Sequence, residues 1–89
     1  MQVDPNVFER LRELLAEMTI TNVAEIIPES HLEEDLAFNL EEDSARLVKN
    51  INRRFDVHLD QESVMDEMEE AGATALELTK LIHDELELG

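Results

Sequence analysis

The chain has 89 residues, of which 43% are apolar, and its 23 acidic against 7 basic residues give a formal net charge of −16. This length predicts a single domain over residues 1–89 with one small core, which must be largely aliphatic because the chain has three Phe and no Trp or Tyr. The charge argues against nucleic acid and anionic membrane surfaces as partners, and the lack of cysteine excludes disulfides, thiolate metal sites and a cysteine nucleophile.

The first predicted helix begins at Asp4, a good N-cap residue, with Pro5 at the first helical position. Val3 and Phe8 would form a hydrophobic staple across this start. Apolar residues then recur at helical spacing and predict a helix to about Met18; they are Phe8, Leu11, Leu14, Leu15 and Met18.

The segment 19–39 breaks the helical pattern and predicts a long loop. Asn22 is suited to cap a short turn that Pro28 would end. A loop of this length is unusual in a compact domain unless it is functional or packed down. Its many apolar residues favour packing against the core: Ile20, Val23, Ile26, Ile27, Leu32, Leu36 and Phe38.

The second strong helix covers roughly 40–55, and two starts are open to it. Asn39 as N-cap, with Glu42 at the third helical position, resembles a capping box and would place Ser44 in the second turn, in line with the apolar stripe. Asp43 as N-cap would instead leave Ser44 at an accessible, electropositive helix end. Local chemistry slightly favours Asn39. The apolar stripe is Leu40, Leu47, Val48, Ile51 and Phe55.

Two further helices complete the chain. A short third helix runs from Asp60 as cap to Gly72, a residue suited to a left-handed C-cap, and Thr74 with Glu77 opens a fourth helix as a capping box. Their apolar residues are Val64, Met65, Met68, Ala75, Leu78, Leu81, Ile82 and Leu86. No strand alternation appears, so the pattern predicts an all-α, small four-helix bundle with a long loop between helices one and two and a short third helix.

The middle of the chain carries a family resemblance. The acidic segment 32–36 (LEEDL), the dipeptide Asp43-Ser44 and the segment 55–60 (FDVHLD) follow one another. Together with the helix order, this pattern resembles the acyl carrier proteins over nearly the whole chain. The resemblance implies a bundle of acyl-carrier type. It also implies a 4′-phosphopantetheine arm attached covalently to the Ser44 hydroxyl, beside Asp43, by a phosphopantetheinyl transferase.

A carrier of this family is a phosphoprotein with no catalytic site of its own. The resemblance implies that the arm holds acyl groups as thioesters and presents them to acyl-transferring or acyl-modifying enzymes of fatty-acid biosynthesis, lipid metabolism or related acyl metabolism. It further implies a cytoplasmic monomer whose core shelters the acyl chain. The residues that would line this shelter are Leu36, Phe38, Leu47, Val48 and Ile51.

The sequence departs from the family pattern around the serine. Ala45 stands where Leu usually follows the serine, and Ala37 replaces the usual glycine after Asp-Leu. The spacing from the acidic segment to Ser44 is longer than usual, and that from Ser44 to Phe55 is shorter. An ungapped count back from Phe55 places the serine position at Glu41, which cannot carry the arm. The alternative function is therefore a carrier-like, acidic protein-interaction module that is not modified.

Four of the seven basic residues fall within 40–55. Arg46, Lys49 and Arg53 are spaced to share one face of the helix, opposite the apolar stripe. The resemblance makes this face a partner-docking surface, with the sign opposite to the family's usual acidic docking helix, and so predicts a specialised set of enzymes. The alternative interpretation, to which we give equal weight, is that the three bases only neutralise neighbouring acidic loops.

Nothing in the sequence indicates catalysis or a metal centre. His31, His58 and His83 fall in separate elements, and no nucleophile–base pair appears, so we expect no enzymatic activity. The carboxylate clusters at 33–35, 41–43 and 67–70 lack the spacing of a calcium loop. No apolar run approaches bilayer length, and the first residues lack a basic region followed by an apolar stretch, so we expect no membrane insertion and a cytoplasmic protein.

Overall fold

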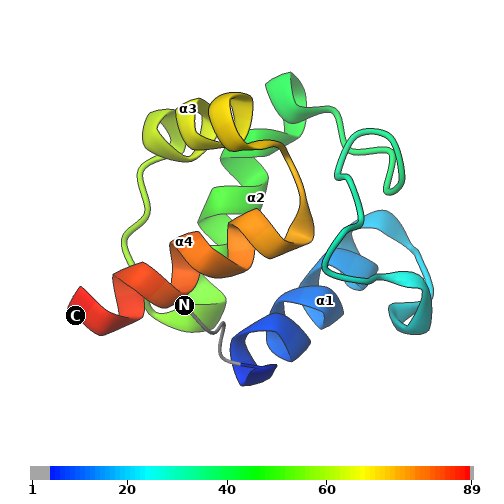
Figure 1. Ribbon diagram of the computed structural model, residues 1–89, viewed down its shortest axis with the longest axis horizontal. Helices are drawn as coiled ribbons and strands as arrows, with labels where there is room; N and C mark the ends of the chain where they lie inside the picture. Colours follow the sequence, from blue (N-terminus) through cyan, green and yellow to red (C-terminus); the bar gives the residue numbers. More distant parts are fainter. Residues whose placement is uncertain (1–4, 89) are drawn as a thin grey trace.

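Four α-helices joined by connections of unequal length make up the computed structural model, which describes residues 5–88 (Figure 1). Helix α1 spans Pro5–Thr19, α2 Leu40–Phe55, α3 Gln61–Ala71 and α4 Ala75–Leu88, and a 3-10 turn, η1, spans Val23–Glu25 in the long α1–α2 connection. No strand occurs in the described part of the chain. The predicted all-α bundle, with its long loop and short third helix, is confirmed. The predicted staple and cap at Val3 and Asp4 lie outside the described residues.

The helices bury the stripes that their periodicity predicts. Helix α1 packs mainly against α4, and α3 packs against both α2 and α4 (Figure 1). The most deeply buried large apolar side chains come from α1, α2, α4 and the long connection: Leu11, Leu15, Ile26, Leu32, Leu47, Ile51, Leu78 and Ile82. Phe8, Met18, Met65 and Leu81 are half-buried at the edge of this core. Leu86, one of the apolar residues of the predicted fourth helix, is not part of the core: its side chain is 39% exposed, because the last turn of α4 reaches the edge of the molecule.

The α1–α2 connection packs down only in part. Ile26, Leu32, Leu36 and Phe38 are buried as predicted. The backbone of the connection pairs with the α3–α4 junction, where the Leu32 N–H donates to the Ala73 carbonyl (2.8 Å). The same expectation is wrong for three residues nearer α1, Ile20, Val23 and Ile27, whose side chains are exposed. The backbone of this stretch is held by its turns and by hydrogen bonds to α1, such as that from the Arg12 guanidinium to the Val23 carbonyl (3.0 Å). These bonds do not require the three side chains to enter the core.

The predicted caps of the shorter elements are present. The Asn22 side chain accepts from the Ala24 N–H (2.9 Å) and caps η1, although this turn ends at Glu25, before Pro28. Asp60 accepts from the Ser63 N–H (3.0 Å) at the start of α3, and Thr74 from the Glu77 N–H (3.2 Å) at the start of α4. These side chains satisfy donors that a helix start leaves without partners, so each fixes where its element begins. Gly72 ends α3 with the positive φ (105°) expected of a glycine, but its ψ of 142° lies outside the left-handed helical region.

Within residues 5–88, three residues other than glycine have a positive φ: Ile20, Ala37 and Asp56, with φ between 55° and 58°. This conformation brings Cβ close to the following carbonyl oxygen and costs roughly 1–2 kcal/mol for an L-residue. Ala37 is the residue that the predicted resemblance places at a glycine position, and its φ of 58° is one that suits glycine. Ile20 is the least expected of the three, because a β-branched residue rarely adopts positive φ.

Candidate functional site

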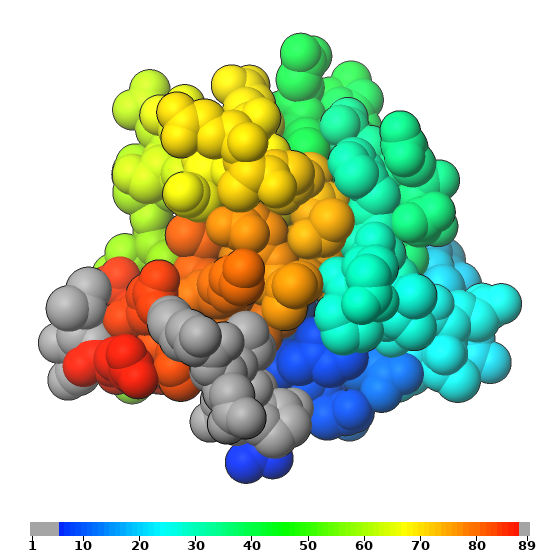
Figure 2. Space-filling model, in the orientation of Figure 1, coloured from blue at the N-terminus to red at the C-terminus, as the bar shows by residue number. Residues whose placement is uncertain are grey.

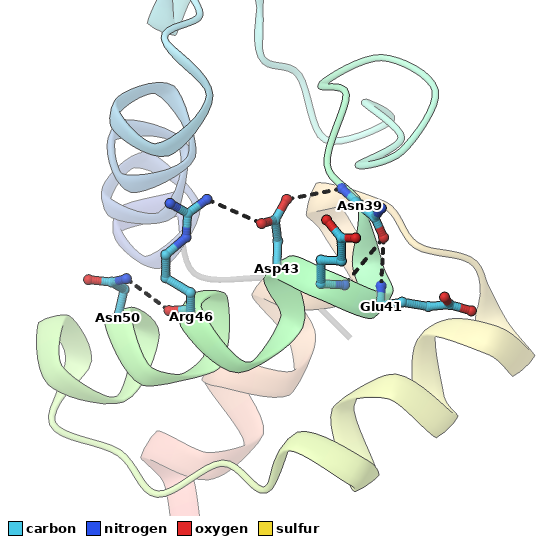
Figure 3. Close-up of polar contacts among 6 residues, drawn as sticks. Asn39, Glu41, Asp43, Arg46 and Asn50 are labelled. Atoms are coloured by element: carbon cyan, nitrogen blue, oxygen red, sulfur yellow. Dashed lines mark hydrogen bonds and ion pairs between the residues drawn. The ribbon is translucent and has the colours of Figure 1, made fainter.

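Helix α2 begins at the first of its two predicted starts. Asn39 is extended, and its Oδ1 accepts hydrogen bonds from the backbone N–H groups of Glu41 (3.1 Å) and Glu42 (3.2 Å) (Figure 3). The Asp43 carboxylate accepts a hydrogen bond from the Asn39 N–H (3.1 Å). In the predicted capping box this acceptor is Glu42, one residue earlier. The alternative start at Asp43 is wrong. The backbone N–H groups of Asn39, Glu41 and Glu42 all find side-chain acceptors in this stretch, and Asp43 is already inside the helix.

Ser44 therefore lies in the second turn of α2, on its buried side. Its side chain is 2% exposed and continues the line of Leu40, Leu47 and Ile51. The hydroxyl oxygen accepts a hydrogen bond from the Nε2 of Gln61, the first residue of α3 (2.9 Å). The accessible hydroxyl that a start at Asp43 would give is not found. The hydrogen bond between Ser44 and Gln61 thus links α2 to α3.

The exposed end of α2 is acidic. Glu41, Glu42 and Asp43 fill the first turn, where carboxylates interact favourably with the positive end of the helix dipole. Glu41, to which an ungapped count from Phe55 assigns the serine position, is exposed in this turn. A phosphodiester at the same helix end would meet three carboxylates and two N–H groups already bonded to Asn39. These residues do not fit an added phosphate.

The five residues predicted to line an acyl shelter are all buried in the core: Leu36, Phe38, Leu47, Val48 and Ile51. They meet there from two elements, the long connection and α2. Their packing shows a continuous core beside Ser44. Whether they ever receive an acyl chain stays a prediction.

The predicted basic stripe, Arg46, Lys49 and Arg53, is exposed along α2. Arg46 lies 3.4 Å from Asp43 of its own helix, and its carbonyl accepts from the Asn50 side chain (2.8 Å) (Figure 3). Within residues 5–88, Lys49 and Arg53 form no ion pair, and no ion pair joins the stripe to a loop. The stripe is therefore available to a partner.

The fourth base of α2 has a structural task that the sequence does not reveal. Arg54 pairs with Glu17 of α1 (3.2 Å), and its carbonyl accepts from Arg10 (2.6 Å). The Arg10 guanidinium also lies over the Phe55 ring, 4.5 Å from its centroid.

The sequence does not reveal the role of Gln61 as the partner of Ser44 either, because an exposed polar residue at a helix start carries no sign of a partner 17 residues away.

Asn39→Ala should lower the free energy of unfolding by about 1 kcal/mol, because two N–H groups at the start of α2 lose their acceptor. Urea unfolding followed by far-ultraviolet circular dichroism would measure the change. Glu42→Ala is the matched control, since the Asn39 N–H donates its hydrogen bond to the Asp43 carboxylate and not to Glu42. Equal effects of the two substitutions would contradict this assignment of the cap.

His31, His58 and His83 stay in separate elements, and His83 lies 3.1 Å from Glu87 of its own helix. Among residues 5–88, no cluster of His, Asp and Glu side chains is placed to hold a metal ion. None of the described helices combines the length and apolar character needed to cross a membrane.

The chain matches no protein-family model and no curated protein. The resemblance to acyl carrier proteins therefore stays a prediction from the sequence, and the function has to be argued from the residues themselves.

Proposed function

We propose that this chain is a carrier-like, acidic protein-interaction module that acts without a phosphopantetheine arm on Ser44. The observation that carries the proposal is the position of the Ser44 hydroxyl, which is buried and accepts a hydrogen bond from Gln61. A transferase must bring the phosphorus of its donor to this oxygen, and near-attack geometry requires roughly 3–3.5 Å between the reacting atoms. A buried oxygen capped by α3 does not admit that approach unless α2 and α3 first separate.

The electrostatics of the helix start support the same proposal. The carboxylates of Glu41, Glu42 and Asp43 occupy the end of α2 that would otherwise attract an anion. A phosphodiester placed among them would add like charge to a chain that already carries −16. The matching helix order accounts for the carrier-like scaffold, and the local residues disfavour the arm.

Without an arm, the chain acts through its surface. Its net charge steers it toward partners with positive potential, and electrostatic complementarity of this kind raises association rates. The exposed stripe of Arg46, Lys49 and Arg53 is a local exception on α2, and it rejects partner surfaces that carry a basic patch at that position.

Incubation with coenzyme A and a promiscuous phosphopantetheinyl transferase, followed by intact-mass measurement, tests the proposal. We expect the native chain to gain no mass while an ordinary acyl carrier protein in the same mixture gains one arm. Glu41→Ser is the matched positive variant, because it places an exposed hydroxyl in the first turn of α2 and removes one of the three carboxylates that disfavour a phosphate there. It should gain one arm.

A gain of one arm by the native chain would overturn the proposal. Loss of that gain in Ser44→Ala, with retention in Ser30→Ala and Ser63→Ala, would establish the alternative function, an acyl carrier protein loaded on Ser44. No gain by Glu41→Ser, against a loaded reference carrier, would remove the carrier-like part of the proposal and leave an interaction module alone.

A further inference from the structure

The connection after α1 turns large apolar side chains toward solvent. Four large apolar residues in the described part of the chain are exposed, and three of them fall within eight residues: Ile20 (95%), Val23 (37%) and Ile27 (50%). In Figure 2 this segment lies at the rim of the molecule, beyond the body formed by the helices. We call residues 20–27 the apolar loop. Single exposed apolar residues need no explanation, but a local group of them is typical of an interaction site.

The apolar loop is held in place by hydrogen bonds rather than left loose. The Thr21 N–H donates to the Ala16 carbonyl (3.1 Å), and the Arg12 guanidinium donates to the Val23 carbonyl (3.0 Å). Ile26, the next-to-last residue of the segment, is fully buried and anchors it to the core. A surface fixed in this way loses little conformational freedom on binding, which favours affinity.

Ile20 is the residue that folding alone explains least. It directly follows the last residue of α1 and has a φ of 55°, a conformation that suits glycine, and its side chain contributes almost nothing to the core. Backbone strain of this kind is found where it serves a function. A large apolar side chain held outward at a strained position is consistent with a side chain kept for contact with a partner.

The charges beside the apolar loop indicate the kind of partner. Glu25 and Glu29 are exposed next to Val23 and Ile27, while the nearby Arg12 is paired with Glu9 (2.9 Å). The side chains that a partner meets here are thus apolar with acidic neighbours. A second copy of the chain or an anionic membrane would also have to overcome the charge of −16.

We infer that the apolar loop docks into an apolar groove bordered by Lys and Arg side chains on a partner protein. This inference rests on the proposed function, since it gives the interaction module its surface. The groove would receive Ile20, Val23 and Ile27, and its basic border would face Glu25 and Glu29.

An amphipathic helical peptide built of leucine and lysine is the probe, with a peptide of equal charge and serine in place of leucine as reference. Calorimetry at low ionic strength and amide chemical-shift mapping should show tighter binding of the leucine peptide, with shifts concentrated on the apolar loop. The triple variant Ile20→Gly, Val23→Ser, Ile27→Ser should weaken that binding about tenfold or more. Leu86→Ser, which removes the exposed apolar residue of α4, should leave it unchanged.

Ile20→Gly alone separates docking from folding. It should raise the urea midpoint, because glycine accepts the backbone conformation, and at the same time weaken binding of the leucine peptide. Ala37→Gly relieves the same kind of strain outside the apolar loop and should change only stability. A fall in both stability and binding for Ile20→Gly would overturn the inference.

Equal binding of the two peptides, or shifts concentrated on α3 and α4, would show attraction by charge alone and overturn the inference. So would binding to zwitterionic vesicles, or self-association that the triple variant abolishes. These results are independent of the mass measurement on Ser44. An unmodified chain that fails to prefer the leucine peptide would lose this inference and keep the proposed function.

Discussion

Ile51→Ala should lower the free energy of unfolding by about 2–4 kcal/mol. Ile51 is fully buried in α2, between Leu47 and Phe55 of the same stripe. Truncation to alanine removes three carbon atoms from this packing and leaves a cavity that the surrounding side chains fill only in part. A domain of this size has a total stability on the order of 5–10 kcal/mol, so a large share would be lost.

Lys49→Ala is the matched control for this substitution, because it truncates an exposed residue two positions away on the same helix. We expect a change within about 0.5 kcal/mol. Urea unfolding should show a lower midpoint for Ile51→Ala with an unchanged slope, as for a loss of stability without a change in compactness. A nearly neutral Ile51→Ala would mean that the stripe of α2 does not form the core.

The helices could be predicted from the sequence because each depends on residues close to one another in the chain. The apolar stripe of α2 repeats at helical spacing, and a cap such as Asp60 needs only a backbone N–H three residues away. Such signals do not depend on how the helices pack. They predict both bounds of the first three helices and the start of the fourth to within about a residue or two, where the structure describes them.

The start of α2 shows where local chemistry and family resemblance disagree. The resemblance favours Asp43 as the cap, whereas the residues around Asn39 favour an earlier start, and the structure has the earlier start. The Asn39 side chain accepts from two N–H groups at once. The Asp43 carboxylate accepts from the Asn39 N–H and therefore supports the earlier start instead of capping a later one. The burial of Ser44 follows from this choice and from Gln61, a partner that no local pattern reveals.

For the long connection, the sequence could not predict which apolar residues are buried and which are exposed. Its apolar content correctly indicates that part of it packs down, but periodicity does not say which residues turn inward in an irregular segment. Adjacent Ile26 and Ile27 have opposite environments, and the difference comes from the turn capped by Asn22 rather than from their own chemistry. The exposed apolar loop therefore became visible only in the structure.

Ile26→Ala should lower the free energy of unfolding by about 2–4 kcal/mol. This loss is as large as that expected for a buried helical residue, although Ile26 lies in a loop. Ile26 is fully buried and follows the last residue of η1, and its N–H donates to the carbonyl of Val23, the first residue of that turn (3.1 Å). Loops usually tolerate substitution because their side chains are solvated. This loop does not have that freedom at Ile26, since the side chain supplies the contact that holds η1 against the core.

Ile27→Ala is the matched control, because it makes the same chemical change one residue later on a side chain that is half exposed. It should cost less than about 1 kcal/mol. Thermal and urea unfolding of the two variants would give the comparison directly, free of any difference in side-chain type. Similar losses for the two would mean that the connection is not anchored at Ile26. A large loss for Ile26→Ala alone would establish that one isoleucine fixes the loop while its neighbour stays available for contact.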